Sequence, residues 1–288
     1  MLDLEKLFEE FLRERRYLKN ISPNTEKFYR QSWTAYKKYS SLELELSKGQ
    51  LNNWVITMRE AGVTPKSCNT FISAINAYVH WLYDSELIPR RIGATLIKLP
   101  DPTPTAVSEK TVQRLSNFKP QSKGQFRTHT VLSLLIDTGM RIDEALSAKL
   151  KDVDLDQSLI TITGKGGRKR TIPISFEMRK RLYVWIKKRG DNPCPFLFPT
   201  STYNRMEYHN YRRDLHVILK KLEIEERIHP HAFRHYFAIT FLRKGGDLFR
   251  LSKILGHANL SVTEIYLSSM PTVAISEAHR QFSPLVQN

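Results

Sequence analysis

Cysteine is nearly absent from this chain of 288 residues, and long apolar runs are missing. Cys68 and Cys194 are too few for a disulfide framework or a thiolate zinc site, so we expect both to be packing residues. No apolar run reaches the roughly 18 residues of a membrane-spanning helix. The first residues, Met1 to Glu5, are acidic and amphipathic, which is unlike a secretory signal. We therefore expect a soluble, cytoplasmic protein that is not embedded in a membrane.

Acidic side chains are scarce relative to basic ones. Lys and Arg number 45 against 29 Asp and Glu, which gives a formal net charge of +16. The excess is uneven, because residues 1–100 carry +4 and residues 101–288 carry +12. A positive charge of this size indicates a polyanionic partner: DNA, RNA or an anionic membrane surface.

The length of the chain favours two domains. Apolar residues keep helical spacing through the first part, where Ser22-Pro23 and Thr64-Pro65 are typical helix starts. We predict a helical domain of four or five helices over residues 1–98. Alternating prolines at positions 100, 102 and 104 then predict an extended linker over residues 99–107.

The second domain, residues 108–288, contains one region in which the apolar period changes to two. Leu159 to Thr163 and Arg170 to Ile174 flank a glycine-rich turn, which predicts a β-hairpin. Pro173 marks its strand as an edge strand, because proline cannot donate to a neighbouring strand. The predicted fold class is mainly α with a small β-hairpin or sheet element.

Residues that could take part in catalysis lie in four separated segments. The first two contribute an arginine and a lysine. In the segment from Thr138 to Leu146, a glycine turn leads into a helix on which Arg141 and Glu144 share a face. The second segment is the hairpin turn. Its Lys165 is flanked by glycines, which allow the backbone to approach another molecule closely.

The other two segments carry histidines and a tyrosine. His231 and Arg234 lie one helical turn apart, which places a titratable base beside a fixed cation. A zinc site at His231 and His235 fails the metalloprotease pattern, because Ala232 stands where a catalytic Glu is needed. His257 and Tyr266 end the series. Between them, Ser261 and Glu264 predict a capping box, and so a helix that starts close to Tyr266.

In this order and spacing, the segments resemble the active-site boxes of the tyrosine recombinases, a family that includes phage integrases and Xer-type resolvases. The resemblance covers the whole chain and departs from the usual pattern at Met140, where Leu is frequent, and at Glu264, where Gln is frequent. It implies a two-domain DNA clamp. Residues 1–98 would be a helical, SAM-like core-binding domain, and residues 108–288 an α+β catalytic domain with a C-terminal tail, 271–288, that docks into a neighbouring protomer.

The resemblance also assigns roles that agree with the chemistry of phosphoryl transfer. Tyr266 is the expected nucleophile, His231 the base, Lys165 the general acid, and Glu144 a support that orients other groups from behind. The expected ligands of the non-bridging phosphate oxygens are Arg141, Arg234 and His257. The expected intermediate is a 3′-phosphotyrosyl link with a free 5′-hydroxyl, formed without metal, ATP or another cofactor.

The implied partner is a double-stranded DNA recombination site, bound by a homotetramer on two duplexes that exchanges strands through a Holliday junction. A related recombinase or an accessory activator protein is a further partner that the sequence leaves open. The sequence also leaves the biological role open among chromosome-dimer resolution, integration or excision of a mobile element, and plasmid resolution. The alternatives are a type IB topoisomerase-like strand transferase and a non-catalytic DNA-binding protein.

A metal-dependent nuclease or calcium module on Asp152, Asp154 and Asp156 is disfavoured. An EF-hand loop that starts at Asp152 needs Gly at its sixth and Glu at its twelfth position, where Gln157 and Thr163 stand. We expect the three carboxylates to lie in a turn before the hairpin.

Overall fold

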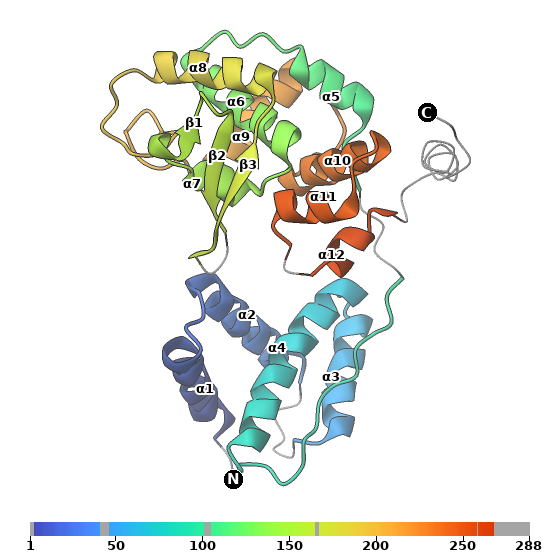
Figure 1. Ribbon diagram of the computed structural model, residues 1–288. Coiled ribbons are helices and arrows are strands. Elements are labelled where there is room, and N and C mark those ends of the chain that lie inside the picture. The colour runs from blue at the N-terminus through green and yellow to red at the C-terminus, as the bar shows by residue number, and fades with distance from the viewer. Residues whose placement is uncertain (1–2, 41–45, 101–104, 165–166, 258, 268–288) are drawn as a thin grey trace, which may run out of the picture. The chain divides into compact units, whose positions relative to one another are not determined.

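The chain divides into two compact units, residues 1–101 and 102–288 (Figure 1). The computed structural model describes residues 3–40, 46–100, 105–164, 167–257 and 259–267. Each unit has its own apolar core. The functions predicted for the two units, a core-binding domain followed by a catalytic domain, stay predictions.

The first unit contains four helices in its described residues: α1 (Leu4–Leu18), α2 (Pro23–Tyr39), α3 (Lys48–Glu60) and α4 (Pro65–Asp84). The two hydroxyl-proline pairs start helices as expected, because the side chains of Ser22 and Thr64 accept backbone N–H groups of the first turns of α2 and α4. Aromatic side chains fill the core. Phe8 stacks on Trp33 with ring centroids 4.7 Å apart, and the Tyr78 hydroxyl donates to the backbone carbonyl of Leu4.

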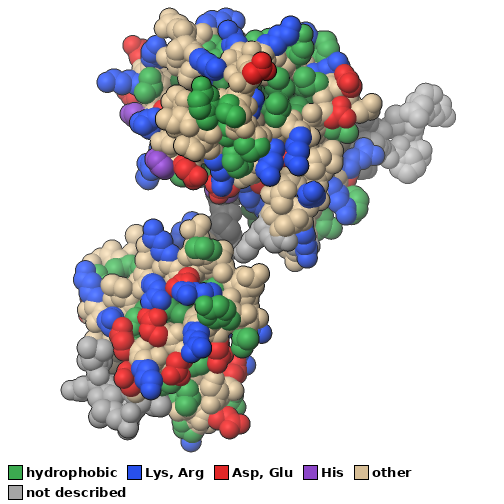
Figure 2. All heavy atoms as spheres, turned by 90° about the vertical axis from the view of Figure 1, so that its left-hand side faces the viewer, with side chains coloured by type: hydrophobic (Ala, Val, Ile, Leu, Met, Phe, Trp, Pro, Cys, Tyr) green, Lys and Arg blue, Asp and Glu red, His purple; other side chains and the backbone are tan. Residues whose placement is uncertain are grey.

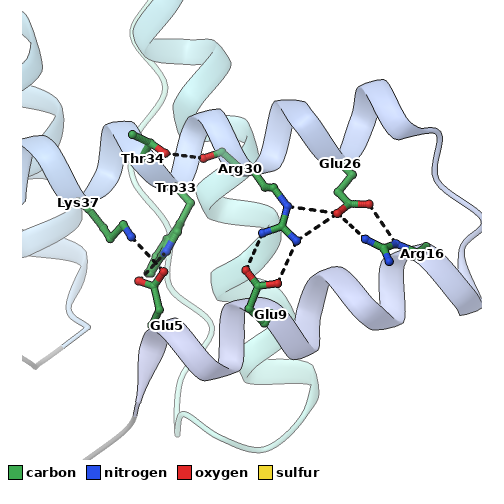
Figure 3. A network of polar contacts seen from close by, with 8 residues as sticks. All are labelled: Glu5, Glu9, Arg16, Glu26, Arg30, Trp33, Thr34 and Lys37. Carbon is green, nitrogen blue, oxygen red and sulfur yellow. Dashed lines mark hydrogen bonds and ion pairs between the residues drawn. The ribbon is translucent and has the colours of Figure 1, made fainter.

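Ion pairs join α1 to α2 on the surface of this unit (Figure 3). Arg30 of α2 contacts Glu9 of α1 at 2.6 Å and Glu26 of its own helix at 3.1 Å, and Arg16 of α1 also contacts Glu26. These pairs are largely exposed, so each contributes little stability by itself. They place basic side chains of α1 and α2 beside acidic ones, and residues 1–100 as a whole carry a small net charge of +4.

The second unit consists of helices around a small sheet: α5 (Glu109–Ser116), α6 (Lys123–Thr138), α7 (Ile142–Ser147), η1 (Leu150–Asp152), β1 (Val153–Asp154), β2 (Leu159–Thr163), β3 (Lys169–Pro173), α8 (Phe176–Arg189), α9 (Tyr208–Lys221), α10 (Pro230–Arg243), α11 (Leu248–Leu255) and α12 (Ser261–Glu264). The strands are antiparallel in the order β1-β2-β3. The predicted fold class, the hairpin and the edge position of the strand with Pro173 are therefore confirmed.

The core of the second unit forms around α6. Its Leu132 and Leu135 are fully buried, as are Ile160 and Ile172 of the sheet. A separate apolar cluster joins α10 and α11 and includes Tyr266. The face of this unit in Figure 2 carries many Lys and Arg side chains, in keeping with the +12 charge of residues 101–288.

The predicted capping box of Ser261 and Glu264 is wrong. Helix α12 does begin at Ser261, but its N-cap is Leu260, and the backbone N–H of Ser261 donates instead to the side chain of Asn259, at 3.1 Å. A neighbouring Asn thus replaces the expected local cap. The helix is one turn long and ends at Glu264, so Tyr266 follows it in a turn.

The expectation for the two cysteines is confirmed, and that for the three carboxylates is confirmed in part, because Asp152 lies in η1, Asp154 in β1 and only Asp156 in the turn. The carboxylates of Asp152 and Asp154 accept backbone N–H groups in the turns before β2, and Cys68 and Cys194 are buried free thiols. A search of the described helices finds none that is long and apolar enough to cross a membrane.

Candidate active site

The first segment is shaped by a tight helix end. Gly139 terminates α6 with φ +63°, a left-handed conformation that glycine adopts without strain. The chain then turns, and Arg141 precedes α7. Glu144 accepts the backbone N–H of Arg141 at 2.7 Å and contacts its guanidinium at 3.1 Å. The Arg141 side chain is still 40% exposed, so its remaining donors can reach a ligand.

Arg234 lies at the centre of the site and is only 4% exposed. Its guanidinium donates to the carbonyls of Gly139 (2.9 Å) and Leu255 (2.8 Å), and so links α10 to the ends of α6 and α11. Burial and the charge of Arg141 lower the pKa of Arg234 to about 10. It therefore stays charged at neutral pH.

His257 is held between a cation and a hydroxyl. Its Nε2 lies 2.6 Å from Nη2 of Arg234, and its Nδ1 lies 2.7 Å from the hydroxyl of Thr263. Because a guanidinium can only donate, Nε2 is the acceptor and the proton is on Nδ1. Burial and the charges of Arg234, Arg141 and Arg170 lower the pKa of His257 to about 4, so the ring is neutral.

Tyr266 is buried against this cluster, with 2% exposure. Its hydroxyl lies 3.0 Å from Nδ1 of His235, which is one turn along α10 from His231. Burial raises the pKa of Tyr266, although the charges of Arg234 and Arg141 oppose the rise. The hydroxyl is therefore protonated and shielded in this arrangement, and it must leave its contact with His235 to attack a phosphate.

His231, the predicted base, occupies the exposed start of α10. Burial of part of its ring, together with the charges of Arg234, His229 and Arg141, lowers its pKa. His231 is thus neutral at physiological pH, the form that can accept a proton.

The structure brings five of the predicted site residues together: Arg141, Glu144, Arg234, His257 and Tyr266. His231 lies beside them, one turn from Arg234. Lys165 lies outside the described residues. Within those residues, no cluster of His, Cys, Asp or Glu has the arrangement of a metal site.

Sequence reasoning missed two neighbours of the site, Arg170 and His235. Arg170 is bound to Glu144 through both guanidinium ends, at 2.8 and 3.0 Å. A signal for it exists in the sequence, because strand alternation places Arg170 on the same face as the buried Ile172, where a charge needs a partner. His235 had no comparable signal, since i, i+4 spacing from His231 does not show which of the two rings faces the tyrosine.

Gly139→Ala is expected to destabilise the second unit more than its backbone angle alone requires. The added Cβ would lie 2.4 Å from Phe237 Cδ1 and 2.9 Å from Leu255 Cδ2. Overpacking of this kind costs about 1–3 kcal/mol, in addition to about 1–2 kcal/mol for the left-handed backbone. The matched control is Gly245→Ala, which has φ +84° but no atom within 4 Å of its added Cβ. If urea unfolding shows that both variants lose the same free energy of unfolding, the tight packing at Gly139 is contradicted.

Comparison with known proteins identifies the family. The model of the phage integrase family matches residues 106–272. The chain is 31% identical over 218 residues to tyrosine recombinase XerC of Bacillus licheniformis, covering 72% of this chain and 71% of that protein. It is 27% identical over 294 residues to tyrosine recombinase XerD of Vibrio cholerae, covering 96% of both.

A solved structure shares the fold. The Tn1549 transposon integrase, in complex with transposon right end DNA, superposes with a TM-score of 0.82 at 17% identity, over 98% of this chain and all of that one. Because the family match spans more than half of the chain and includes Arg141, Arg234, His257 and Tyr266, the protein belongs to the phage integrase family of tyrosine recombinases.

Proposed function

We propose that this protein is a site-specific DNA recombinase that cuts and rejoins strands through Tyr266. The observation that carries the proposal is a cluster in which the charges of Arg234 and Arg141 act on the Tyr266 hydroxyl and His257 is held against Arg234. Arginine forks match the oxygens of a phosphate, and preorganised cations stabilise the charge that develops on them during transfer. A protein that only binds DNA has no need of a buried tyrosine beside these groups.

In the proposed cleavage step, the Tyr266 oxygen attacks a backbone phosphorus and His231 takes the hydroxyl proton. The bond from phosphorus to the 5′-oxygen breaks, and Lys165 supplies the proton that this oxygen needs. The products are a 3′-phosphotyrosyl link and a free 5′-hydroxyl. A 5′-hydroxyl from another strand reverses the reaction and joins the two strands. The bond energy is conserved, so ATP is not required.

The donor role proposed for His257 requires a rearrangement. Nε2 now accepts from Arg234. When a phosphate takes over the Arg234 donors, Nε2 is released. The single ring proton must then move from Nδ1 to Nε2, with Nδ1 accepting from the Thr263 hydroxyl, before Nε2 can donate to a non-bridging oxygen. Arg141, which is more exposed, reaches the phosphate without giving up a buried contact.

The proposed partner is a double-stranded DNA site, bound by four protomers on two duplexes that pass through a Holliday junction. Residues 1–98 act as the core-binding domain, residues 99–107 as the linker and residues 108–288 as the catalytic domain. The tail, 271–288, lies outside the described residues and is proposed to dock into a neighbouring protomer. A related recombinase or an accessory protein as a further partner belongs to the same proposal.

Cleavage is expected to survive the removal of metal ions, because side chains supply every role in the proposed step. The test uses a nicked duplex that carries the sequence selected by the protein from a random library, and it measures the SDS-stable protein–DNA adduct with and without EDTA. Equal yields support the proposal. Strict dependence on magnesium or calcium would instead favour a metal-dependent nuclease.

A further inference from the structure

Arg170 occupies an unusual position for a charged residue. It lies on β3 opposite Ile162 of β2, on the strand face that also carries the buried Ile172. Its side chain is only 17% exposed. A cation in such a place is costly unless its donors are satisfied, so its contacts show what it does.

The Arg170 guanidinium connects three segments of the active site. Nη1 and Nη2 donate to the two carboxylate oxygens of Glu144, at 2.8 and 3.0 Å, and Nε donates to the carbonyl of Ile254, at 3.1 Å. Glu144 in turn holds the backbone and the side chain of Arg141. Ile254 belongs to the last turn of α11, just before His257.

Two glycines make room for this guanidinium. A Cβ on Gly256 would lie 2.7 Å from Cζ of Arg170, and one on Gly164 would lie 3.4 Å from its Nη1. Gly164 is the residue before Lys165 in the hairpin turn. The arginine is thus enclosed by the start of that turn on one side and by the end of α11 on the other.

The carboxylate that Arg170 binds is buried and receives its other hydrogen bonds from Arg141. Glu144 is 6% exposed. Burial by itself raises the pKa of Glu144, but hydrogen bonds from Arg170 and from the backbone of Arg141 outweigh it and leave the pKa below its usual value. Arg170 provides the largest of these opposing effects.

We propose that Arg170 is a positioning residue of the strand-cleavage reaction: it fixes the Glu144 carboxylate and the Ile254 carbonyl in one place, and thereby fixes Arg141 and the segment that leads to His257. The inference rests on the proposed function, since it concerns the geometry of the same phosphate-binding groups. Misplacement of such groups by about 1 Å can cost up to about 100-fold in rate.

Arg170→Met, which keeps an unbranched apolar stem and removes the charged guanidinium, tests the proposal. The control is Arg127→Met on α6, because Arg127 has the same kind of partners, one carboxylate (Asp214, 3.1 Å) and one carbonyl (Pro199, 2.7 Å), at a similar 14% side-chain exposure. Both variants lose a partly buried ion pair. Only Arg170→Met is expected to slow adduct formation on the nicked duplex, by about tenfold or more.

The pH profile separates positioning from a general loss of stability. Without Arg170, the pKa of Glu144 rises, and the carboxylate is lost as the pH falls through the new value. The deficit of Arg170→Met relative to wild type should therefore grow as the pH falls through that new pKa, by up to about tenfold per pH unit below it. The ratio of the wild-type rate to the Arg127→Met rate should not change with pH.

Arg170→Lys keeps the positive charge but cannot bind both carboxylate oxygens and the Ile254 carbonyl together. It should be slower than wild type by about tenfold, with little growth of the deficit at low pH. If Arg170→Met does not fold, the rate of Arg170→Lys tests the positioning role of Arg170. Rates for Arg170→Lys or Arg170→Met that equal the wild-type rate, or a deficit of Arg170→Met that stays constant with pH, would overturn the proposal. Absence of an adduct from wild type would instead overturn the proposed function.

Discussion

Tyr266→Phe is expected to abolish the covalent protein–DNA adduct while leaving binding to the duplex nearly unchanged. The variant loses one hydroxyl and none of the phosphate-binding charge of Arg141 and Arg234. Within the protein it loses the hydrogen bond to His235, which costs stability on the order of 1 kcal/mol, so the fold should persist. An SDS gel detects the adduct, and a mobility shift measures binding.

The control for this prediction is a second tyrosine with a similar burial. Tyr211 on α9 is fully buried and belongs to the core around α6. Tyr211→Phe should keep the adduct. An adduct yield from Tyr266→Phe close to that of wild type would mean that another residue is the nucleophile.

Arg234→Ala is expected to lower both cleavage and stability, whereas Arg141→Ala should lower cleavage alone. Losing one preorganised donor to a developing oxyanion costs about 100- to 1000-fold in rate, so both variants should cleave at least about 100 times more slowly. Arg234 also satisfies the buried carbonyls of Gly139 and Leu255, and each carbonyl left unpaired costs about 1–3 kcal/mol. Arg141 is 40% exposed and leaves no such carbonyl behind.

Adduct formation and urea unfolding of the two variants check this difference. Arg234→Lys should recover little cleavage, because an ammonium cannot bind both carbonyls and a phosphate in the geometry of a guanidinium. A folded Arg234→Ala protein that cleaves within about tenfold of wild type would contradict the role of Arg234.

Much of the fold could be predicted from local signals. The hydroxyl-proline pairs at Ser22 and Thr64 start helices because their side chains satisfy the free N–H groups of the first turn. The change of period at residues 159–174 located the hairpin, since only a strand alternates its faces in this way. The same kind of local reasoning was wrong at Ser261, because the Asn259 side chain, two residues away, competes for the same N–H.

The candidate site could be predicted only in part. The sequence order of Arg141, Arg234, His257 and Tyr266 resembles a known family. It does not show which of these side chains contact one another. Arg170 and His235 take their roles from contacts between segments far apart in the chain, Glu144 to Arg170 and His235 to Tyr266. The burial that makes Tyr266 a protonated, shielded hydroxyl also depends on the packing of α10 and α11, which no local pattern specifies.

If Tyr266 is the nucleophile, Tyr266 itself becomes linked to DNA, and identifying the linked residue tests this. Wild-type protein is trapped on the nicked duplex in EDTA, the DNA is trimmed with nuclease, and the peptides are examined by mass spectrometry. We expect a nucleotide attached through its 3′-phosphate to the Tyr266 side chain, and a free 5′-hydroxyl on the released strand. Attachment to another residue, or a link through a 5′-phosphate, would contradict it.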